Sequence, residues 1–470
     1  LILFLCRGII IIIIINKRYF YSNINCYLMY LLNRRYEGMM KKLIGSKTFY
    51  VSVLLLTLPM LLQQGFSAFV SVADNLMVGR LGTNEITGVA IANQLVFVYY
   101  LCIFGALSGA SIFATQYFGA KNIEGVQSCF RFKLITVFVL FTIFGVLFYC
   151  FGDRLVLLFL SDEELLLEEV QGILYYSKEY LQIMLLGLLP FGIVQLYSSS
   201  LRETKKAVLP MICGISALIV NVTLNYVLIF GALGIEAMGT KGAAIATVIA
   251  RLVEFSLIVS ITHIRKNHYP FVHKLYKTIM VPWTLSKKIL LKGSPLFFNE
   301  LMLALGSTFL FQIFSMRGIE VVVAYNISST ITQFFFVAYA TLGSATAIIV
   351  GQLLGAKKLE EAKKAAKHLI VLMVVVSIFL NIGILITSYY IPNLYNTTEE
   401  IKELSRHLMY VIAFLMPIYA INVQCYFILR AGGITYATFL FDSVFMWIIS
   451  IPVAFILTSH TVLSVMIIYI

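Results

Sequence analysis

The chain has 470 residues, of which 60% are hydrophobic and only 12% are charged, and its mean hydropathy is +0.93. Soluble domains are about half apolar and a quarter charged, so this composition excludes an ordinary soluble protein and indicates a membrane protein with several spans. The net charge of +13 does not indicate nucleic-acid binding, because the lysines and arginines lie in short loops between apolar runs and form no basic groove with interleaved aromatic residues.

The first 38 residues differ from the rest of the chain. Residues 1–15 form an apolar run that Arg7 interrupts; no basic region precedes it and no small-residue cleavage site follows it. This pattern matches neither a signal peptide nor a complete span. Met39 and Met40 open the stretch MMKKLIGSK, which is typical of a natural start. Residues 1–38 are therefore expected to be a non-native or disordered extension.

Eleven apolar runs are long enough to cross the hydrocarbon core as helices, which takes about 20 residues. They lie near 50–73, 87–115, 133–152, 180–200, 207–230, 242–264, 292–315, 321–350, 368–391, 406–429 and 434–457. A twelfth run begins near residue 459 and reaches Ile470. The sequence thus predicts an all-α membrane protein with twelve transmembrane helices, the last of them truncated. The seven cysteines show no C-x-x-C pair and are interpreted as packing residues, so no metal site is expected.

Loop charges predict the orientation of these spans. The loops after the second, fourth, sixth and eighth spans are basic, with Lys121, Arg131 and Lys133; Arg202, Lys205 and Lys206; Arg265, Lys266, Lys274, Lys277, Lys287 and Lys288; and Lys357, Lys358, Lys363, Lys364 and Lys367. The opposite loops are acidic, at 162–169 and at Glu399, Glu400 and Glu403. Because positive loops stay inside, the basic loops and the N-terminus are expected in the cytoplasm.

Short motifs recur in the two halves of the chain. Gln116 and the G-A-K triplet that ends at Lys121 reappear as Gln352 and a second G-A-K triplet, 236 positions later. Leu201-Arg202 likewise matches Leu429-Arg430, 228 positions later. Each half therefore holds six spans in the same order, which predicts two six-helix lobes related by a pseudo-two-fold axis along the membrane normal. Transporters that alternate access use this design.

The expected boundaries of the lobes follow from the spans. The N-lobe is predicted at 39–264, a cytoplasmic linker at 265–291, and the C-lobe, incomplete at its end, at 292–470.

Several motifs in their order and spacing resemble one transporter family. They are VADNLMVGRLG at 72–82, ATQYFGAKN at 114–122, LRETKKAVLPM at 201–211, NVTLNYVLIFG at 221–231, GAAIATVIAR at 242–251 and GSPLFFNE at 293–300. From about residue 45 to the end, the chain is similar to the multidrug and toxic compound extrusion (MATE) family of the MOP flippase superfamily.

The resemblance implies two six-helix lobes that export lipophilic organic cations in exchange for Na⁺ or H⁺. It also implies a monomer in the bacterial cytoplasmic membrane, without enzymatic activity and without a cofactor other than the coupling ion.

Asp74 lies inside the first apolar run. A charged side chain at mid-membrane costs at least ~2.5–3.5 kcal/mol, so it is retained where it faces a cavity, pairs with a polar group or binds a cation. Alternatively, Asp74 lies near the outer end of its helix and is solvated by the loop. The resemblance implies that Asp74 couples transport to the driving ion.

Asn221 and Asn225 are four residues apart and therefore share one helix face. Two amides in an apolar helix can simply hold helices together. The resemblance instead places this pair beside Asp74 in an N-lobe ion site. Because some members of the family have a second aspartate where this chain has Asn225, a two-carboxylate site is not expected. Pro59 is expected to bend or unwind the first span near this site, although a static packing kink is the alternative.

Glu300 and Asp442 are the carboxylates predicted for the C-lobe. Glu300 follows Pro295 in the seventh span, where the resemblance implies an essential cation site, although it lies nearer the proline than in NorM-like members. Those members also have an aspartate in the tenth span, where this chain has Tyr419. Asp442, in the eleventh span, either partners Glu300 or pairs locally with a backbone group or a hydroxyl.

Two other functions are compatible with the sequence. A lipid-linked oligosaccharide flippase of the same superfamily has the same helical plan, but it needs a basic cavity, whereas the embedded charges identified here are acidic. A membrane enzyme needs clustered acids or histidines, and no pair of the six histidines has ligand spacing within a span. Export of lipophilic cations is therefore the predicted function.

Overall fold

The computed structural model describes residues 45–78, 81–159, 167–273, 275–395, 397–461 and 465–469. These ranges are almost entirely helical and contain no strand, and eleven of their helices have the length and hydropathy of a membrane span. The predicted fold class is confirmed, and the protein is a multi-pass membrane protein. The extension predicted at residues 1–38 lies outside the described residues.

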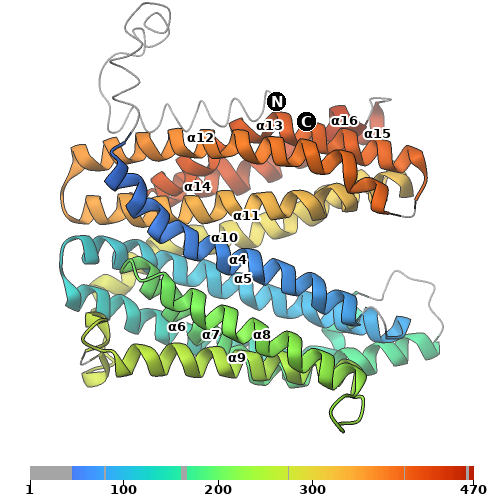
Figure 1. The fold of residues 1–470 in the computed structure, drawn as a ribbon, viewed down its shortest axis with the longest axis horizontal. Helices are drawn as coiled ribbons and strands as arrows, with labels where there is room; N and C mark the ends of the chain where they lie inside the picture. Colours follow the sequence, from blue (N-terminus) through green and yellow to red (C-terminus); the bar gives the residue numbers. More distant parts are fainter. Residues whose placement is uncertain are drawn as a thin grey trace, which may run out of the picture. The chain divides into compact units, whose positions relative to one another are not determined.

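The spans follow one another in chain order (Figure 1). The first nine are α4 (Lys47–Val78), α5 (Thr83–Gly119), α6 (Ile123–Leu157), α7 (Leu167–Glu203), α8 (Val208–Phe230), α9 (Gly239–Ile264), α10 (Trp283–Ser315), α11 (Ile319–Gly355) and α12 (Leu359–Tyr390). The tenth is α13 (Glu399–Ala431), and short 3₁₀ turns lie at η1 (Pro270–Val272), η2 (Leu275–Lys277) and η3 (Pro392–Leu394).

The eleventh span is not a uniform α-helix. It starts as α14 (Thr435–Phe439), widens into the π-helical turns η4 (Leu440–Val444) and η5 (Met446–Ser450), and ends as α15 (Ile451–His460). A short helix, α16 (Val465–Tyr469), lies where the twelfth span is expected.

Most of the helices begin before the apolar run that predicted them. At the start of α6 the side chain of Asn122 accepts a hydrogen bond from the N–H of Gly125 at 2.9 Å, which caps a free helix end. Lys133 was expected in the loop after the second span. This expectation is wrong, because the cap at Asn122 starts the helix well before Lys133, which lies buried within α6.

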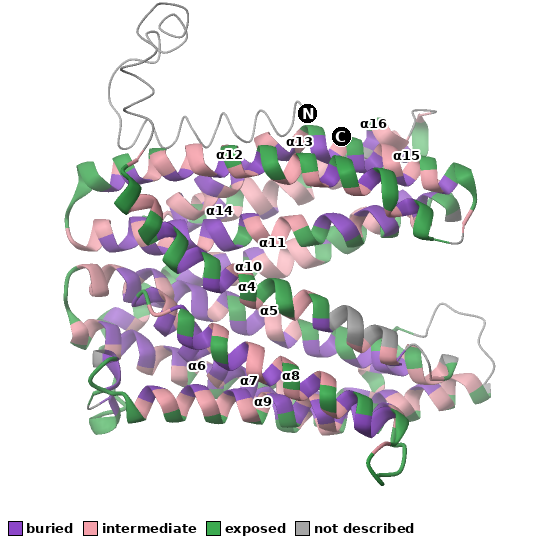
Figure 2. Cartoon of the chain, in the orientation of Figure 1, coloured by how far each residue is buried: buried purple, intermediate pink, exposed green. Residues whose placement is uncertain are grey.

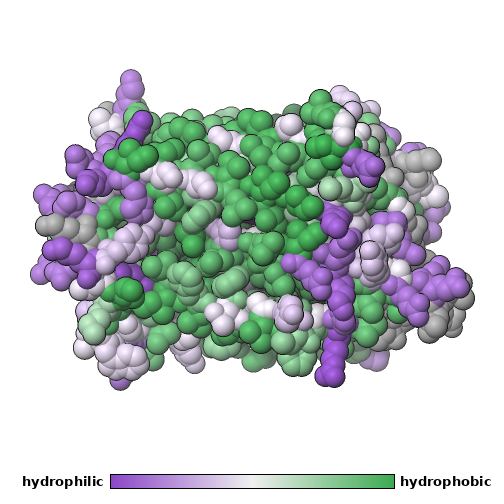
Figure 3. All heavy atoms as spheres, turned by 90° about the horizontal axis from the view of Figure 1, so that it is seen from below, coloured by the Kyte–Doolittle hydropathy of each residue, from purple (hydrophilic) through white to green (hydrophobic). Residues whose placement is uncertain are grey.

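Apolar side chains are exposed along the helices, as expected for spans that face lipid. Buried and exposed residues alternate along single helices such as α9 (Figure 2). The face drawn in Figure 3 is hydrophobic over its middle, and hydrophilic residues gather towards its two ends.

The chain divides into two compact units. Among the described residues, 58–297 form the N-terminal unit, and 45–57 together with 298–469 form the C-terminal unit. In the N-terminal unit α7 packs against α5, α6 and α9, and α8 packs against α9; in the C-terminal unit α13 packs against α11 and α12. The chain passes between the units inside α4 and inside α10, close to Pro59 and Pro295 respectively.

The internal repeat predicted from the motifs appears in the backbone. Lys121 and Lys357 follow α5 and α11 with φ angles of 58° and 60°, and in both turns the preceding alanine donates its N–H to a glutamine carbonyl at 2.9 Å. Lys205 and Gly433 follow α7 and α13 with φ angles of 61° and 72°. A left-handed residue is a common way to end a helix. The two units therefore share the same helix–turn geometry at both pairs of motifs.

Candidate functional site

The N-terminal unit brings three of the predicted site residues together. The Nδ2 atom of Asn225 on α8 donates to Oδ1 of Asp74 on α4 at 2.6 Å. When the Asn221 amide is oriented to satisfy its hydrogen bonds, its Nδ2 atom donates to Oδ2 and Oδ1 of Asp74 at 3.1 and 3.2 Å. Both asparagines are buried, whereas Asp74 is half-buried. The carboxylate is thus held by two amides on one face of α8.

The same cluster offers oxygen atoms that a cation could bind. The Oδ1 atom of Asn225 is buried and has no hydrogen-bond partner among the described residues. Beside it, Thr247 on α9 packs its hydroxyl 3.4 Å from the Asn221 amide. Carboxylate, amide and hydroxyl oxygens are the ligands that hard cations prefer. The cluster therefore has the chemistry of a small cation site.

Charged residues that the sequence analysis missed lie close to this cluster. Arg251, near the middle of α9, places Nη1 3.4 Å from Oε2 of Glu254. Its guanidinium also lies over the rings of Phe191 and Tyr100, with the carbon 5.0 and 5.8 Å from the ring centroids. The expectation that the embedded charges are acidic is therefore wrong. The signal was present in the sequence, because an arginine and a glutamate three residues apart interrupt the apolar run 242–264.

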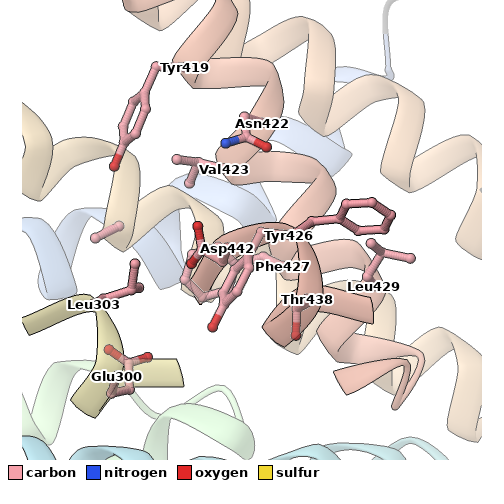
Figure 4. Close-up of a pocket in the computed structure, with 12 residues that line it drawn as sticks. Glu300, Leu303, Tyr419, Asn422, Val423, Tyr426, Phe427, Leu429, Thr438 and Asp442 are labelled. Carbon is pink, nitrogen blue, oxygen red and sulfur yellow. The ribbon is translucent and has the colours of Figure 1, made fainter. Parts of the chain in front are cut away.

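The C-terminal unit contains a cavity of about 200 Å³ that holds both of its predicted carboxylates. Glu300 comes from α10 and Asp442 from the π-helical turn η4, while α13 contributes Tyr419, Asn422 and Tyr426. Figure 4 shows these side chains around the cavity, with Glu300 and Asp442 on different elements. Glu300 is also within electrostatic reach of Asp442 and of Arg430 on α13.

Asp442 has a partner that was not predicted. The Nδ2 atom of Asn299 donates to Oδ2 of Asp442 at 3.1 Å, and Oγ of Ser443 donates to Oδ1 of Asn299 at 2.7 Å. Asn299 and Ser443 are fully buried. Single π-helical turns inside α-helices frequently occur at functional sites, where the wider turn changes the direction of a side chain. Here the turn and the buried amide together orient the Asp442 carboxylate.

The two remaining predicted positions are also located. Tyr419, at the position where the resemblance implied an aspartate, lines the cavity of the C-terminal unit. Pro59 lies inside α4, which is assigned as one helix from Lys47 to Val78. It precedes Asp74 by 15 positions, or about 22 Å along a helix axis at 1.5 Å per residue.

The MatE family model matches residues 59–227 and 295–456, which is more than half of the chain. The chain belongs to the MatE family. This result confirms the resemblance to MATE transporters that the motifs indicated.

Individual relatives agree with this assignment. "Probable multidrug resistance protein YoeA" of Bacillus subtilis is 25% identical over 421 residues, with 88% of each chain covered. "Probable multidrug resistance protein NorM" of Thermotoga maritima is 24% identical over 409 residues, with 86% of this chain and 85% of the relative covered.

Solved structures share the MatE fold at low sequence identity. An outward-facing multidrug resistance MATE family transporter of the MOP superfamily matches with a TM-score of 0.78 at 17% identity, covering 91% of this chain and 92% of the other. A mutant of the Vibrio cholerae MATE transporter VcmN matches with a TM-score of 0.77 at 15% identity, covering 88% of this chain and 91% of the other. These structures support the fold of the chain.

Proposed function

We propose that this MatE-family protein is an antiporter that exports lipophilic organic cations by alternating access, driven by Na⁺ or H⁺. The observation that carries the proposal is the Asp74 carboxylate, which sits inside an apolar helix and is held by the amides of Asn221 and Asn225. A carboxylate in this setting is costly unless it serves an ion or a partner. The names of the relatives as multidrug resistance proteins support the same conclusion.

The cavity of the C-terminal unit supports a preference for cationic cargo. Glu300 and Asp442 contribute two negative charges, and Arg430 contributes one positive charge within electrostatic reach of Glu300. Drug-sized ligands occupy pockets of about 300–1,000 Å³, which is larger than this cavity of about 200 Å³. The cavity is therefore suited to a coupling ion or to the charged group of a larger cargo molecule, and it must widen to admit the rest.

A lipid-linked oligosaccharide flippase is the alternative that the cations within the N-terminal unit favour. Flippases need positive charge for pyrophosphate, and Arg251 and Lys133 lie inside the N-terminal unit. However, the side chain of each of these cations faces a carboxylate, at 3.4 and 2.6 Å respectively. Since their charge is already matched, we favour cationic cargo.

The proposed location is the cytoplasmic membrane of a bacterium, where the chain works as a monomer with its N-terminus inside. The basic loops near Lys121, Lys205 and Lys357 are then cytoplasmic, and the acidic segment around Glu399 is external. Single cysteines at these positions, in a cysteine-free background, are treated with a membrane-impermeant thiol reagent on intact cells. We expect labelling only near Glu399, and labelling of the basic loops from outside would overturn the orientation.

The function is tested with the purified protein in proteoliposomes. Efflux of ethidium is followed while an inward Na⁺ gradient and an inward proton gradient are imposed separately. We expect one of the two gradients to drive ethidium export. Ethidium transport that neither gradient drives would overturn the proposal. Tight binding of an anionic lipid-linked sugar in place of ethidium would overturn it as well.

A further inference from the structure

Charges of alternating sign lie next to one another inside the N-terminal unit. Asp74 on α4 is within electrostatic reach of Arg251 on α9, and Arg251 is 3.4 Å from Glu254. Glu254 in turn is within electrostatic reach of Arg202 on α7, which donates through Nη2 to Oε1 of Gln63 at 2.7 Å. Thr247, which contacts Asn221 beside Asp74, lies one helical turn before Arg251 on α9. The guanidinium of Arg251 is therefore within reach of two carboxylates, one of which is the proposed coupling residue.

The groups around Arg251 stabilise its positive charge but do not bind its guanidinium tightly to a single carboxylate. The rings of Tyr100 and Phe191 are stacked with centroids 3.9 Å apart, and the guanidinium lies over both. A ring face attracts a cation through its quadrupole, and arginine stacks well on such faces. The contact of 3.4 Å with Glu254 is longer than a strong charge-assisted hydrogen bond, which is about 2.7–2.9 Å. The side chain is also 30% exposed, so it has room to shift.

We propose that Arg251 is a tethered cation that competes with the coupling ion for Asp74, and that Glu254 draws it away when the ion arrives. This inference rests on the proposed function, because it requires that Asp74 receives an ion. A positive charge within reach of Asp74 disfavours a second cation there, and the negative charge of Glu254 next to Arg251 offsets this effect. Arg251 and Glu254 are thus positioning residues that set how tightly the N-terminal unit holds its ion.

Other charged and titratable groups also lie around Arg251 and Glu254. Tyr100 hydrogen-bonds to Arg251, and Arg202 is within electrostatic reach of Glu254. Tyr180 on α7 is within electrostatic reach of Asp74. Farther along, Glu203 is bound to Lys133 at 2.6 Å. Among the described residues, Arg251 is the cation that acts electrostatically on Asp74, so the competition is assigned to it.

The proposal is tested with two variants that each remove one charge, Arg251→Gln and Glu254→Gln, because it predicts opposite shifts in the half-saturating concentration of the driving ion. Ethidium efflux from proteoliposomes is measured against external Na⁺ at fixed pH, and against external pH without Na⁺. We expect Arg251→Gln to lower the half-saturating concentration of the driving ion about tenfold, which corresponds to about 1.4 kcal/mol. Glu254→Gln should raise it about tenfold, and the double variant should lie near the wild type because it removes one charge of each sign.

Further variants separate charge from packing and from the proposed function. Arg251→Lys keeps the charge but loses the stacking on Tyr100 and Phe191, so it should shift the half-saturating concentration much less than Arg251→Gln does. Lys178→Gln, at an exposed pair on α7, is the control and should leave this concentration unchanged. If Asp74→Asn leaves the ion dependence intact, the assignment of Asp74 itself fails. If Asp74→Asn removes that dependence but the Arg251→Gln and Glu254→Gln shifts share one sign or stay below twofold, only the tethered cation is overturned.

Discussion

The two units use the same helical plan but treat buried charge in opposite ways. In the N-terminal unit, Lys133 on α6 and Glu203 on α7 form a buried ion pair at 2.6 Å. The repeat places Leu369 on α12 and Ala431 on α13 at the equivalent positions, 236 and 228 residues later, and both are buried and apolar. The backbone of one repeat therefore accepts either a salt bridge or an apolar contact at this site. The ion pair is not required by the fold.

The same contrast holds around the candidate sites. In the N-terminal unit, Glu254 lies among the arginines Arg251 and Arg202. In the C-terminal unit Glu300 is within electrostatic reach of Asp442 and Arg430, and Asp442 is held by the neutral amide of Asn299. Balanced charge favours a site that exchanges a small ion, whereas an excess of negative charge favours a site that accepts a cationic cargo. The comparison suggests different tasks for the two units.

The largest expected effect is the loss of coupling in Asp74→Asn. The amide keeps the size of the side chain and can still hydrogen-bond to Asn225, but it has no charge to bind a cation. We expect gradient-driven ethidium efflux to fall to the background level while the protein is still inserted and folded. Asp153→Asn, an exposed carboxylate on α6, is the matched control and should transport normally. Normal efflux by a well-expressed Asp74→Asn variant would remove this residue from the coupling site.

The buried pair gives the second-largest effect, on stability. Lys133→Leu leaves the buried Glu203 carboxylate without the ammonium group, and breaking a buried pair costs about 3–5 kcal/mol. We expect a correspondingly lower free energy of unfolding, measured by titration with a denaturing detergent.

The double variant Lys133→Leu, Glu203→Ala copies the pair of residues found in the C-terminal unit. Replacing a buried ion pair by apolar residues is often neutral or stabilising. It should therefore recover most of the stability that Lys133→Leu loses. A double variant as unstable as the single one would mean that the two units do not tolerate the same exchange.

Much of the fold was predictable from the sequence because a membrane span needs a long apolar run, and such runs are visible without a structure. The pairing of Asn221 with Asn225 was predictable from their spacing on one helix face. Their contact with Asp74 was not a consequence of the sequence pattern alone, because α4 and α8 are far apart in the chain, with 151 positions between Asp74 and Asn225. It came from the family resemblance.

The remaining features of the two candidate sites could not be predicted from the local sequence. Arg251 and Glu254 are three residues apart, which is also the spacing of an ordinary surface ion pair, so their spacing does not show that Glu254 is buried. The contact between Asn299 and Asp442 joins residues 143 positions apart, and the π-helical turns after Phe439 follow no sequence rule. Such features depend on tertiary packing.

The third prediction concerns the sign of the cargo. A carboxylate 4 Å from a cation attracts it by roughly 4 kcal/mol at an effective dielectric of 20, and desolvation removes part of this gain. Glu300→Gln should therefore weaken the binding of ethidium about tenfold and that of an uncharged ligand much less. Binding is measured in detergent without any gradient, so that a loss of ion coupling cannot imitate a loss of affinity. Equal weakening for charged and neutral ligands would remove Glu300 from the cargo site.

The smallest expected effect comes from a second ion pair between the same two helices. Asp153 on α6 and Lys178 on α7 lie 2.7 Å apart, as close as Lys133 and Glu203, but their side chains are 49% and 50% exposed. Water screens both charges, so an exposed pair contributes about 0–1 kcal/mol. We expect Lys178→Gln to change the free energy of unfolding by less than about 1 kcal/mol in the titration used for Lys133→Leu. Because the helices and the contact distance are shared, the difference between the two results measures burial. Equal losses would show that α6 and α7 need both pairs, and that burial does not set how much an ion pair between these helices contributes to stability.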